Sequence, residues 1–428
     1  MKILDYLFYA ILFIVASIGL IAYDISKDIY FMLPSNIAQK QEVYEKEQWD
    51  INATNLLNID IERVDSSRYL ISYLDKNNND TNVYGMLFYP NKYSTTLRNG
   101  VWQNITTNTK VHTEASLLLN TSTLKTKTKQ YMKNINTALL QRDDSNIYMF
   151  INATLTQKPL IAKNYIFEAN LNQIANYIES NDKQPKENNK SHIDSIFILH
   201  SNPTLSIFSK LNAFLSHKPI SFVVSKNFTQ GAILPFYTHL GKNMAFFGIF
   251  NKQLQLQEII KPHNNTIYTN PLITPLNAHY DLNTKTNDIT THSCLALYQR
   301  QPILNNALNL AYQFCKVSNG TLQFDELQES SLSVGEGISV ATLGRYVILV
   351  YTDETNTALN LAVWNGVDFT LLKELDRSMN GNIISPHILT HGIYAYIVYA
   401  KNMQNRINVI TLNELYITNL IAAQNAET

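Results

Sequence analysis

Glycine and cysteine are scarce in this sequence, with 13 glycines and two cysteines among 428 residues. No glycine-rich phosphate loop, Gly-x-Ser-x-Gly elbow or Cys-x-x-Cys pair occurs in it. Two cysteines are also too few for a disulfide scaffold or a cysteine-rich zinc module. We therefore expect no metal and no other cofactor.

Net charge is missing as well, because 34 Lys and Arg residues balance 34 Asp and Glu residues. No block of basic residues interrupts this balance. A protein that binds nucleic acid normally shows such a basic footprint. We therefore expect no nucleic-acid partner.

Long hydrophobic runs are absent except at residues 6–23, which carry no charged side chain. A helix of this length spans roughly 27 Å, just enough for the hydrocarbon core of a bilayer. A cleaved signal peptide is the alternative, and residues 17–19 are the one acceptable cleavage site. The apolar run continues through this site, whereas the apolar region of a signal peptide ends before its cleavage site. We favour an uncleaved signal anchor.

The charges beside this run suggest an orientation, since Lys2 precedes it and favours a cytoplasmic N-terminus. The chain then divides into four parts. These are a signal anchor (1–23), a polar juxtamembrane stalk (24–48), a folded body (49–416) and a C-terminal tail (417–428). This division predicts a single-pass membrane protein with its body outside the cytoplasm.

Strand and turn residues dominate the body, where Tyr, Phe, Thr, Ile and Asn are abundant. One strand pattern recurs, in which alternating aromatic and aliphatic residues follow a turn and precede a polar exit. Six segments share this pattern: 66–75, 145–154, 242–251, 293–301, 344–353 and 391–401. An Asn-Gly pair before an aromatic residue recurs at Asn99, Asn319 and Asn365, and Asn-Gly suits a two-residue hairpin turn.

Four strands repeated at roughly 45–50 residues are typical of a propeller blade. Six such units fit within residues 50–415. The sequence therefore predicts an all-β fold, a six-bladed β-propeller preceded by one N-terminal transmembrane helix. A β-sandwich with fortuitously similar strands is the alternative.

The two cysteines, Cys294 and Cys315, fall on segments 293–300 and 309–316, which can pair as a symmetric hairpin. Opposed side chains on antiparallel strands are close enough for a disulfide. An oxidising compartment would permit this bond. Two buried thiols are the alternative, and the sequence leaves both open.

With the repeats placed, the body resembles the bacterial sialidase (neuraminidase) family. Six stretches carry the likeness in collinear order: RYLISYLDKNNNDTNVYGMLFYPN (68–91), LNAFLSHKPISF (211–222), GAILPFYTHLG (231–241), LALYQRQ (295–301) and the C-terminal pair 335–366 and 385–414. The Asn-Gly hairpins resemble worn Asp boxes of that family. The resemblance implies a six-bladed propeller that acts on an acidic glycan. Together with the predicted anchor, the resemblance implies that the protein is held in the inner membrane of a bacterium and that its folded body lies in the periplasm.

Sialidases hold the sugar carboxylate with arginines, whose planar fork binds both oxygens at once. Arg300 and Arg406 fall at strand exits where the family keeps functional arginines. Lys218 lies where a further arginine is expected, and Tyr237 is retained with His239 close by. The resemblance therefore assigns substrate binding to these five residues.

The catalytic acid is less well preserved, because asparagines occupy the acidic positions of the first-blade signature. Proton donation would have to come from Asp75 or Asp80, or from Glu336 in a loop that faces the site in the family. The tyrosine expected before the last strand is absent. His387 and His391 lack the glutamate of a zinc helix motif, and we interpret them as ordinary turn and surface histidines.

Three functions remain open at this stage. The first is a membrane-anchored, sialidase-like glycosidase with a remodelled site. The second is a catalytically inactive propeller that binds an acidic glycan. The third is an envelope scaffold that uses its faces for protein partners.

Overall fold

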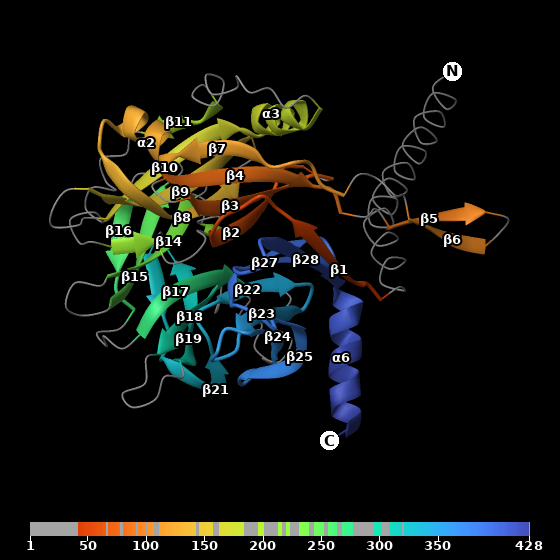
Figure 1. Ribbon diagram of the computed structural model, residues 1–428. Coiled ribbons are helices and arrows are strands. Elements are labelled where there is room, and N and C mark those ends of the chain that lie inside the picture. Colours follow the sequence, from red (N-terminus) through yellow and green to blue (C-terminus); the bar gives the residue numbers. More distant parts are fainter. Residues whose placement is uncertain are drawn as a thin grey trace, which may run out of the picture.

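A computed structural model gives the fold of the protein (Figure 1). It describes residues 42–65, 67–77, 80–90, 93–98, 101–106, 111–142, 145–156, 162–183, 196–200, 213–215, 220–222, 231–238, 244–251, 256–262, 268–276, 294–300, 308–318 and 321–427. The predicted anchor at 6–23 lies outside these ranges. Within them, no helix is long and apolar enough to cross a membrane.

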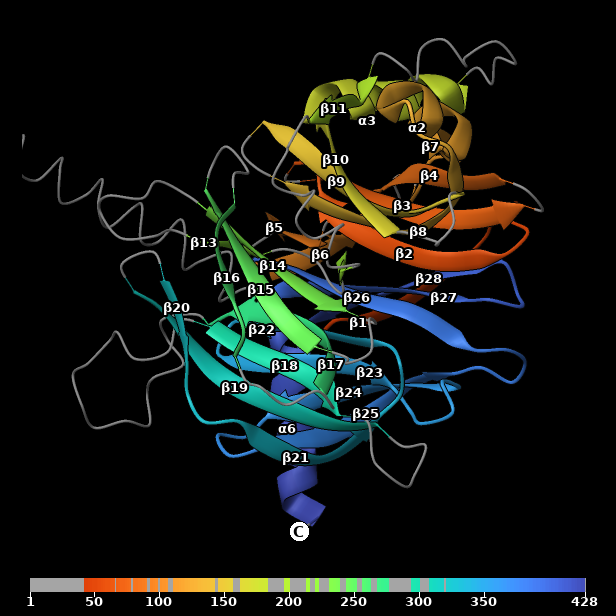
Figure 2. The same ribbon diagram turned by 90° about the vertical axis from the view of Figure 1, so that its left-hand side faces the viewer.

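The described strands form six sheets of four or five strands around a common axis, so the fold is the predicted six-bladed β-propeller (Figure 2). Blade 1 consists of β2 (Leu56–Arg63), β3 (Tyr69–Asn77), β4 (Asp80–Phe88) and β7 (Ser116–Asn120). Blade 2 consists of β8 (Met132–Arg142), β9 (Asn146–Leu155), β10 (Ala162–Asn170) and β11 (Ile198–His200). Blade 3 consists of β12 (Ala213–Leu215), β13 (Ile220–Phe222), β14 (Gly231–Thr238), β15 (Met244–Asn251) and β16 (Leu256–Ile260).

Blade 4 consists of β17 (Tyr268–Pro275), β18 (Cys294–Arg300), β19 (Leu308–Ser318), β20 (Thr321–Phe324) and β21 (Gln328–Val334). Blade 5 consists of β22 (Ile338–Leu343), β23 (Tyr346–Thr352), β24 (Ala358–Trp364) and β25 (Phe369–Arg377). The sixth is β26 (Ile383–His391), β27 (Tyr394–Lys401), β28 (Arg406–Asn413) and β1 (Tyr44–Asp50). Helix α2 (Thr121–Thr128) packs against β4, β7 and β8, and α3 (Leu171–Lys183) packs against β4, β7 and β10. Helix α6 (Glu414–Glu427) follows the last strand.

Strand β1 closes the ring, because it pairs with β28 from Tyr44 opposite Leu412 to Asp50 opposite Arg406. Residues 44–48, which we expected in the stalk, are therefore part of the propeller. Most of the expected C-terminal tail is helical, as α6.

Apolar side chains fill the space between neighbouring blades. Between blades 6 and 1, for example, Ile59 and Ile61 of β2 share one buried cluster with Val398 and Val409. Strands that are covered on both faces read as continuous apolar runs, as in β23, where every residue after the first is buried. This double burial explains why the recurring aromatic and aliphatic pattern was visible in the sequence.

Five of the six recurring segments are the second strands of their blades, at β3, β9, β18, β23 and β27. The exception is 242–251, which contains β15, the third strand of blade 3. Its second strand is β14, which is also aromatic and pairs with β15 along its whole length. Both strands mix aromatic and aliphatic residues, so the pattern alone did not separate them.

The Asn-Gly pairs connect paired strands, as predicted. Pairing of Arg98 with Val101 and of Ser318 with Thr321 leaves two-residue connections. The third connection is longer than predicted, because Trp364 pairs with Phe369. Figure 1 shows that β5 (Tyr93–Arg98) and β6 (Val101–Thr106) extend away from the blades, so this hairpin is an insertion in blade 1.

The sequence left a disulfide and two buried thiols open, and the structure shows the disulfide. Cys294 on β18 lies directly opposite Cys315 on β19, their Cα atoms are 4.9 Å apart, and the two sulfurs are bonded. The bond fixes the register of two strands in blade 4.

Candidate functional site

A pocket of about 260 Å³ lies on the propeller axis, at the end where the inner strands begin. The pocket is lined by residues near the start of four inner strands, β2, β17, β22 and β26. Residues from the middle of β8 and Asn356 of the β23–β24 turn complete this part of the lining. The inner strands of a propeller run in the same direction, so their starts meet at one end. Central pockets of this kind are the usual ligand sites of folded domains.

Amide side chains from five blades line this pocket: Asn58, Asn136, Asn270, Asn356 and Asn382. An amide both donates and accepts hydrogen bonds. A buried hydroxyl adds to them, since Oγ1 of Thr137 has no hydrogen-bond partner among the described residues. Buried polar atoms usually have a partner, so this lining suits a ligand rich in hydroxyl groups.

The backbone is irregular where it meets the pocket. Strands β2, β8, β17 and β26 each shift register there, for example between Ile384 and His387. Three non-glycine lining residues have positive φ, namely Asn270 (48°), Asn356 (56°) and Ser385 (46°). Bulges and strained residues concentrate at functional sites, because they aim side chains at a ligand.

Glu336 reaches the pocket on a loop that hydrogen bonds hold rigidly. Its N–H donates to Oδ1 of Asn356 (2.9 Å), and its carbonyl accepts from Nε2 of Gln299 (3.1 Å). Its neighbour Gly335 has no room for a side chain, because a Cβ would collide with the carbonyl oxygen of Asp353. The loop therefore presents the exposed Glu336 carboxylate from a fixed backbone.

His387 lines the pocket and forms a buried acid–imidazole pair with Asp60. Nδ1 of His387 is 3.5 Å from Oδ1 of Asp60, and both side chains are almost fully buried. The second oxygen of Asp60 accepts the N–H of Leu140 (2.6 Å). Asp60 thus joins blades 1, 2 and 6, and it orients a histidine that borders the pocket.

Of the three predicted acids, only Glu336 lines the pocket. Asp75 is buried, and its Oδ1 accepts the N–H groups of Thr54 (2.9 Å) and Asn55 (2.7 Å). This oxygen fastens the connection between β1 and β2. Asp80 begins β4, and its Oδ1 accepts the N–H of the next residue (3.0 Å).

The two predicted arginines do not line the pocket either. Arg300 ends β18 and pairs with Glu329 of β21. Arg406 begins β28 and pairs with Asp50 of β1 at 2.6 Å. Both therefore have carboxylate partners toward the outer strands of their blades.

The remaining predicted residues are in blade 3. Lys218 and His239 lie outside the described residues, and Tyr237 is placed by its backbone, opposite Phe214 and Ala245.

The sequence analysis missed Asp60 and His387, and the interpretation of His387 as a turn or surface histidine was wrong. The available signal was Asp60 itself, a charged residue between Ile59 and Ile61 in an otherwise apolar strand. Such a buried charge needs a partner. The partner is 327 residues away in the sequence, so no local pattern connects the two.

No protein-family model matches the chain, and no curated protein matches it. Among solved structures the chain is similar to a Trypanosoma rangeli sialidase, with a TM-score of 0.51 and 6% identity, over 89% of this chain and 58% of that one. It is also similar to a Hadza microbial sialidase, with a TM-score of 0.51 and 7% identity, over 85% of this chain and 66% of that one. The chain thus spans less than two thirds of these proteins. At such identities the likeness concerns the fold, and it confirms the sialidase-like propeller that the sequence predicted.

Proposed function

We propose that the propeller binds a glycan in its central pocket. The observation that carries this proposal is the convergence of five asparagines, Thr137 and Glu336 on one cavity where the inner strands are bulged. Hydroxyl groups of a sugar match amide and carboxylate side chains in hydrogen-bonding capacity. The sialidase-like fold supports the same ligand class.

Binding without hydrolysis fits the lining better than catalysis. Most glycosidases place two carboxyl groups on either side of the scissile bond. Among the described lining residues Glu336 supplies one, whereas Asp60 is fully buried behind His387. Hydrolysis is the second candidate function, with Glu336 as the acid, because its carboxylate is exposed in the pocket.

The lining also bears on the charge of the sugar. The resemblance implies an acidic glycan, whose carboxylate needs a cation. Among the described residues the pocket holds one carboxylate and no Lys or Arg. We infer that an uncharged sugar binds more tightly than sialic acid.

We further propose that residues 6–23 anchor the protein in the inner membrane of a bacterium, with the propeller in the periplasm. The uncharged run of 18 residues supports the anchor, and the disulfide supports an oxidising compartment. Membrane fractionation with protease accessibility of intact spheroplasts tests this. Full-length protein in the soluble fraction would contradict it.

The binding proposal is tested with the purified full-length chain on a glycan array that carries neutral and sialylated glycans. Calorimetry on the best ligand then compares Glu336→Gln with Glu354→Gln, an exposed acid on a neighbouring turn that does not line the pocket. We expect about 10- to 150-fold weaker binding for Glu336→Gln and no change for Glu354→Gln, since one hydrogen bond to a charged group contributes about 1.5–3 kcal/mol.

Two results would overturn the proposal: no bound glycan on the array, or equal affinity in both variants. Fluorophore release from 4-methylumbelliferyl sialoside and from neutral glycosides separates the two candidate functions. Turnover that Glu336→Gln abolishes would establish hydrolysis, and its absence leaves binding.

A further inference from the structure

The opposite end of the propeller axis gathers positive charge. Arg63 is the last residue of β2, Arg142 the last of β8 and His391 the last of β26. These inner strands are neighbours around the axis, so their last residues meet at the end away from the pocket. With eight residues, β2 separates the two ends by roughly 25 Å.

Direct contacts bring these residues together. Nη1 of Arg142 donates to the carbonyl of Arg63 (3.4 Å). Arg63 is paired with Tyr69, whose hydroxyl is 2.7 Å from Nδ1 of His391. Three blades thus contribute to one cluster of Arg63, Tyr69, Arg142 and His391, which we name the strand-end cluster.

The two arginines act on the imidazole of His391. Burial lowers the pKa of His391, and the charges of Arg63 and Arg142 lower this pKa further. The imidazole is therefore neutral at pH 7, and both guanidiniums act on it. Two cations close together repel each other unless an anion lies between them.

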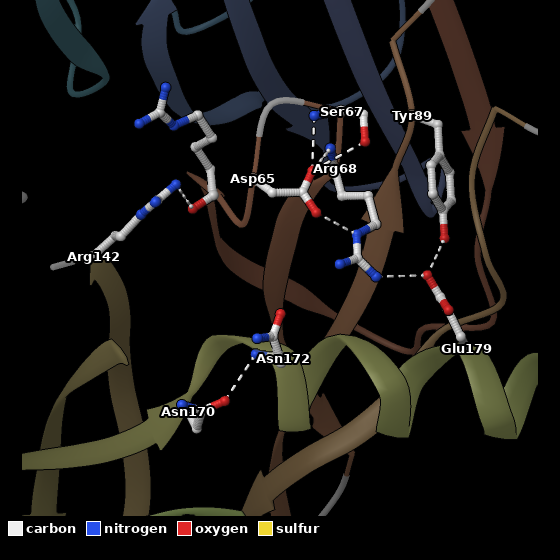
Figure 3. Close-up of polar contacts among 9 residues, drawn as sticks. Asp65, Ser67, Arg68, Tyr89, Arg142, Asn170, Asn172 and Glu179 are labelled. Carbon is white, nitrogen blue, oxygen red and sulfur yellow. Dashed lines mark hydrogen bonds and ion pairs between the residues drawn. The ribbon is translucent and has the colours of Figure 1, made fainter. Parts of the chain in front are cut away.

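The carboxylates of Asp65 and Glu179 have other partners. In Figure 3 dashed lines join Asp65 to Ser67 and Arg68, and Glu179 to Arg68 and Tyr89. Oε1 of Glu62 accepts the backbone N–H of Arg63. Among the described residues, the guanidinium of Arg63 forms no ion pair.

We propose that the strand-end cluster is a second binding site, which takes an oxyanion (phosphate, sulfate or carboxylate) between Arg63, Arg142 and His391. A planar guanidinium binds two oxygens of such a group at once. The half-buried imidazole limits access to one side, and its hydrogen bond to Tyr69 fixes its orientation. The site lies at the other end of the axis, so it does not depend on the glycan pocket.

Two measurements on the full-length protein test this proposal. The first is the melting temperature in sodium sulfate and sodium phosphate against sodium chloride at equal ionic strength. A ligand that binds only the folded state raises this temperature. Both salts stabilise folded proteins in general, so the specific effect is the difference between variants. We expect the rise to be largest in the wild type and in Arg345→Gln, a control that removes an exposed arginine from the β22–β23 turn at the same end, and clearly smaller in Arg63→Gln.

The second measurement is an NMR titration of His391, assigned with His391→Gln. A bound anion offsets the guanidinium charges, so the pKa of His391 should rise by about half a unit or more in sulfate and stay unchanged in chloride. Glucose 6-phosphate and glucuronic acid, each compared with glucose, show whether the anion is carried on a sugar or is free. The proposal fails if neither sulfate nor a sugar anion moves this pKa, or if Arg63→Gln gives the same shift as the wild type.

Discussion

At the scale of single residues, burial and partners decide what an acidic side chain does. Asp75, Asp80 and Glu336 were equivalent candidates by composition. The structure gives Asp75 a buried role in joining two strands and leaves Glu336 exposed in the pocket. The difference lies in which backbone N–H groups surround each carboxylate.

This difference predicts the effect of removing each acid outside the pocket. Asp75→Ala leaves the N–H groups of Thr54 and Asn55 without their acceptor, so urea unfolding should show a loss of about 2–4 kcal/mol. Asp80→Ala is the matched control and should cost less than about 1 kcal/mol, because this carboxylate accepts from its neighbour at a strand end. Glycan affinity should survive both changes. Equal destabilisation by the two variants would contradict this assignment.

Residue contacts across the axis were beyond prediction from the sequence. Glu336 was found because the family resemblance places its loop against the site. The pair of Asp60 and His387 was missed because blades 1 and 6 are the two ends of the ring. Residues far apart in the chain meet there only after the ring closes.

At the scale of secondary-structure elements, strands that are buried on both faces were predictable and edge strands were not. The second strands of five blades stood out by their continuous apolar runs. β1 did not, because its exposed polar residues alternate with half-buried ones and Trp49 is its one buried side chain. A polar edge strand has the composition of a linker, which is why residues 44–48 were assigned to the stalk.

The disulfide belongs to this scale, because it cross-links two adjacent strands of blade 4. Cys294 and Cys315 are 21 residues apart, and a loop of that size stabilises the folded state by about 3 kcal/mol in the chain-entropy model. Guanidinium unfolding with dithiothreitol should therefore show a loss of about that size. In a Cys294→Ala/Cys315→Ala variant, dithiothreitol should have no further effect. An unchanged midpoint on reduction of the wild type would contradict the cross-link.

At the scale of the whole molecule, the ring is closed by β1 and by the contacts that it makes. Trp49 of β1 packs against Phe88 of blade 1, with ring centroids 5.4 Å apart. On the other side, Tyr44 stacks on Tyr416 of α6, and its hydroxyl donates to the carbonyl of Leu375 in blade 5. The first described strand therefore binds the last blade to both of its neighbours.

Asp376 is the charged centre of this closure. Its carboxylate contacts Lys46 of β1 (2.5 Å), and Lys401 (2.8 Å) and Tyr399 (2.5 Å) of β27. Burial would raise the pKa of Asp376, but hydrogen bonds from Lys401, Lys46 and Tyr399 outweigh it and lower this pKa. A lowered pKa in the folded state means that the carboxylate stabilises the fold above its ordinary value of about 4. This contribution is lost as the pH falls through the lowered pKa.

Asp376→Asn should therefore lower the free energy of unfolding by about 3–5 kcal/mol at pH 7, because it leaves two lysines without their shared partner. The variant should also lose less stability than the wild type between pH 5 and the acid limit, since its amide does not titrate. Asp50→Asn is the matched control, as Asp50 of β1 forms an exposed pair with Arg406 of β28, and such pairs contribute at most about 1 kcal/mol. Urea unfolding from pH 3 to pH 8 measures both effects. Parallel pH profiles for wild type and Asp376→Asn would mean that the ring is held closed by its apolar contacts, and that the Asp376 cluster is only an accessory to them.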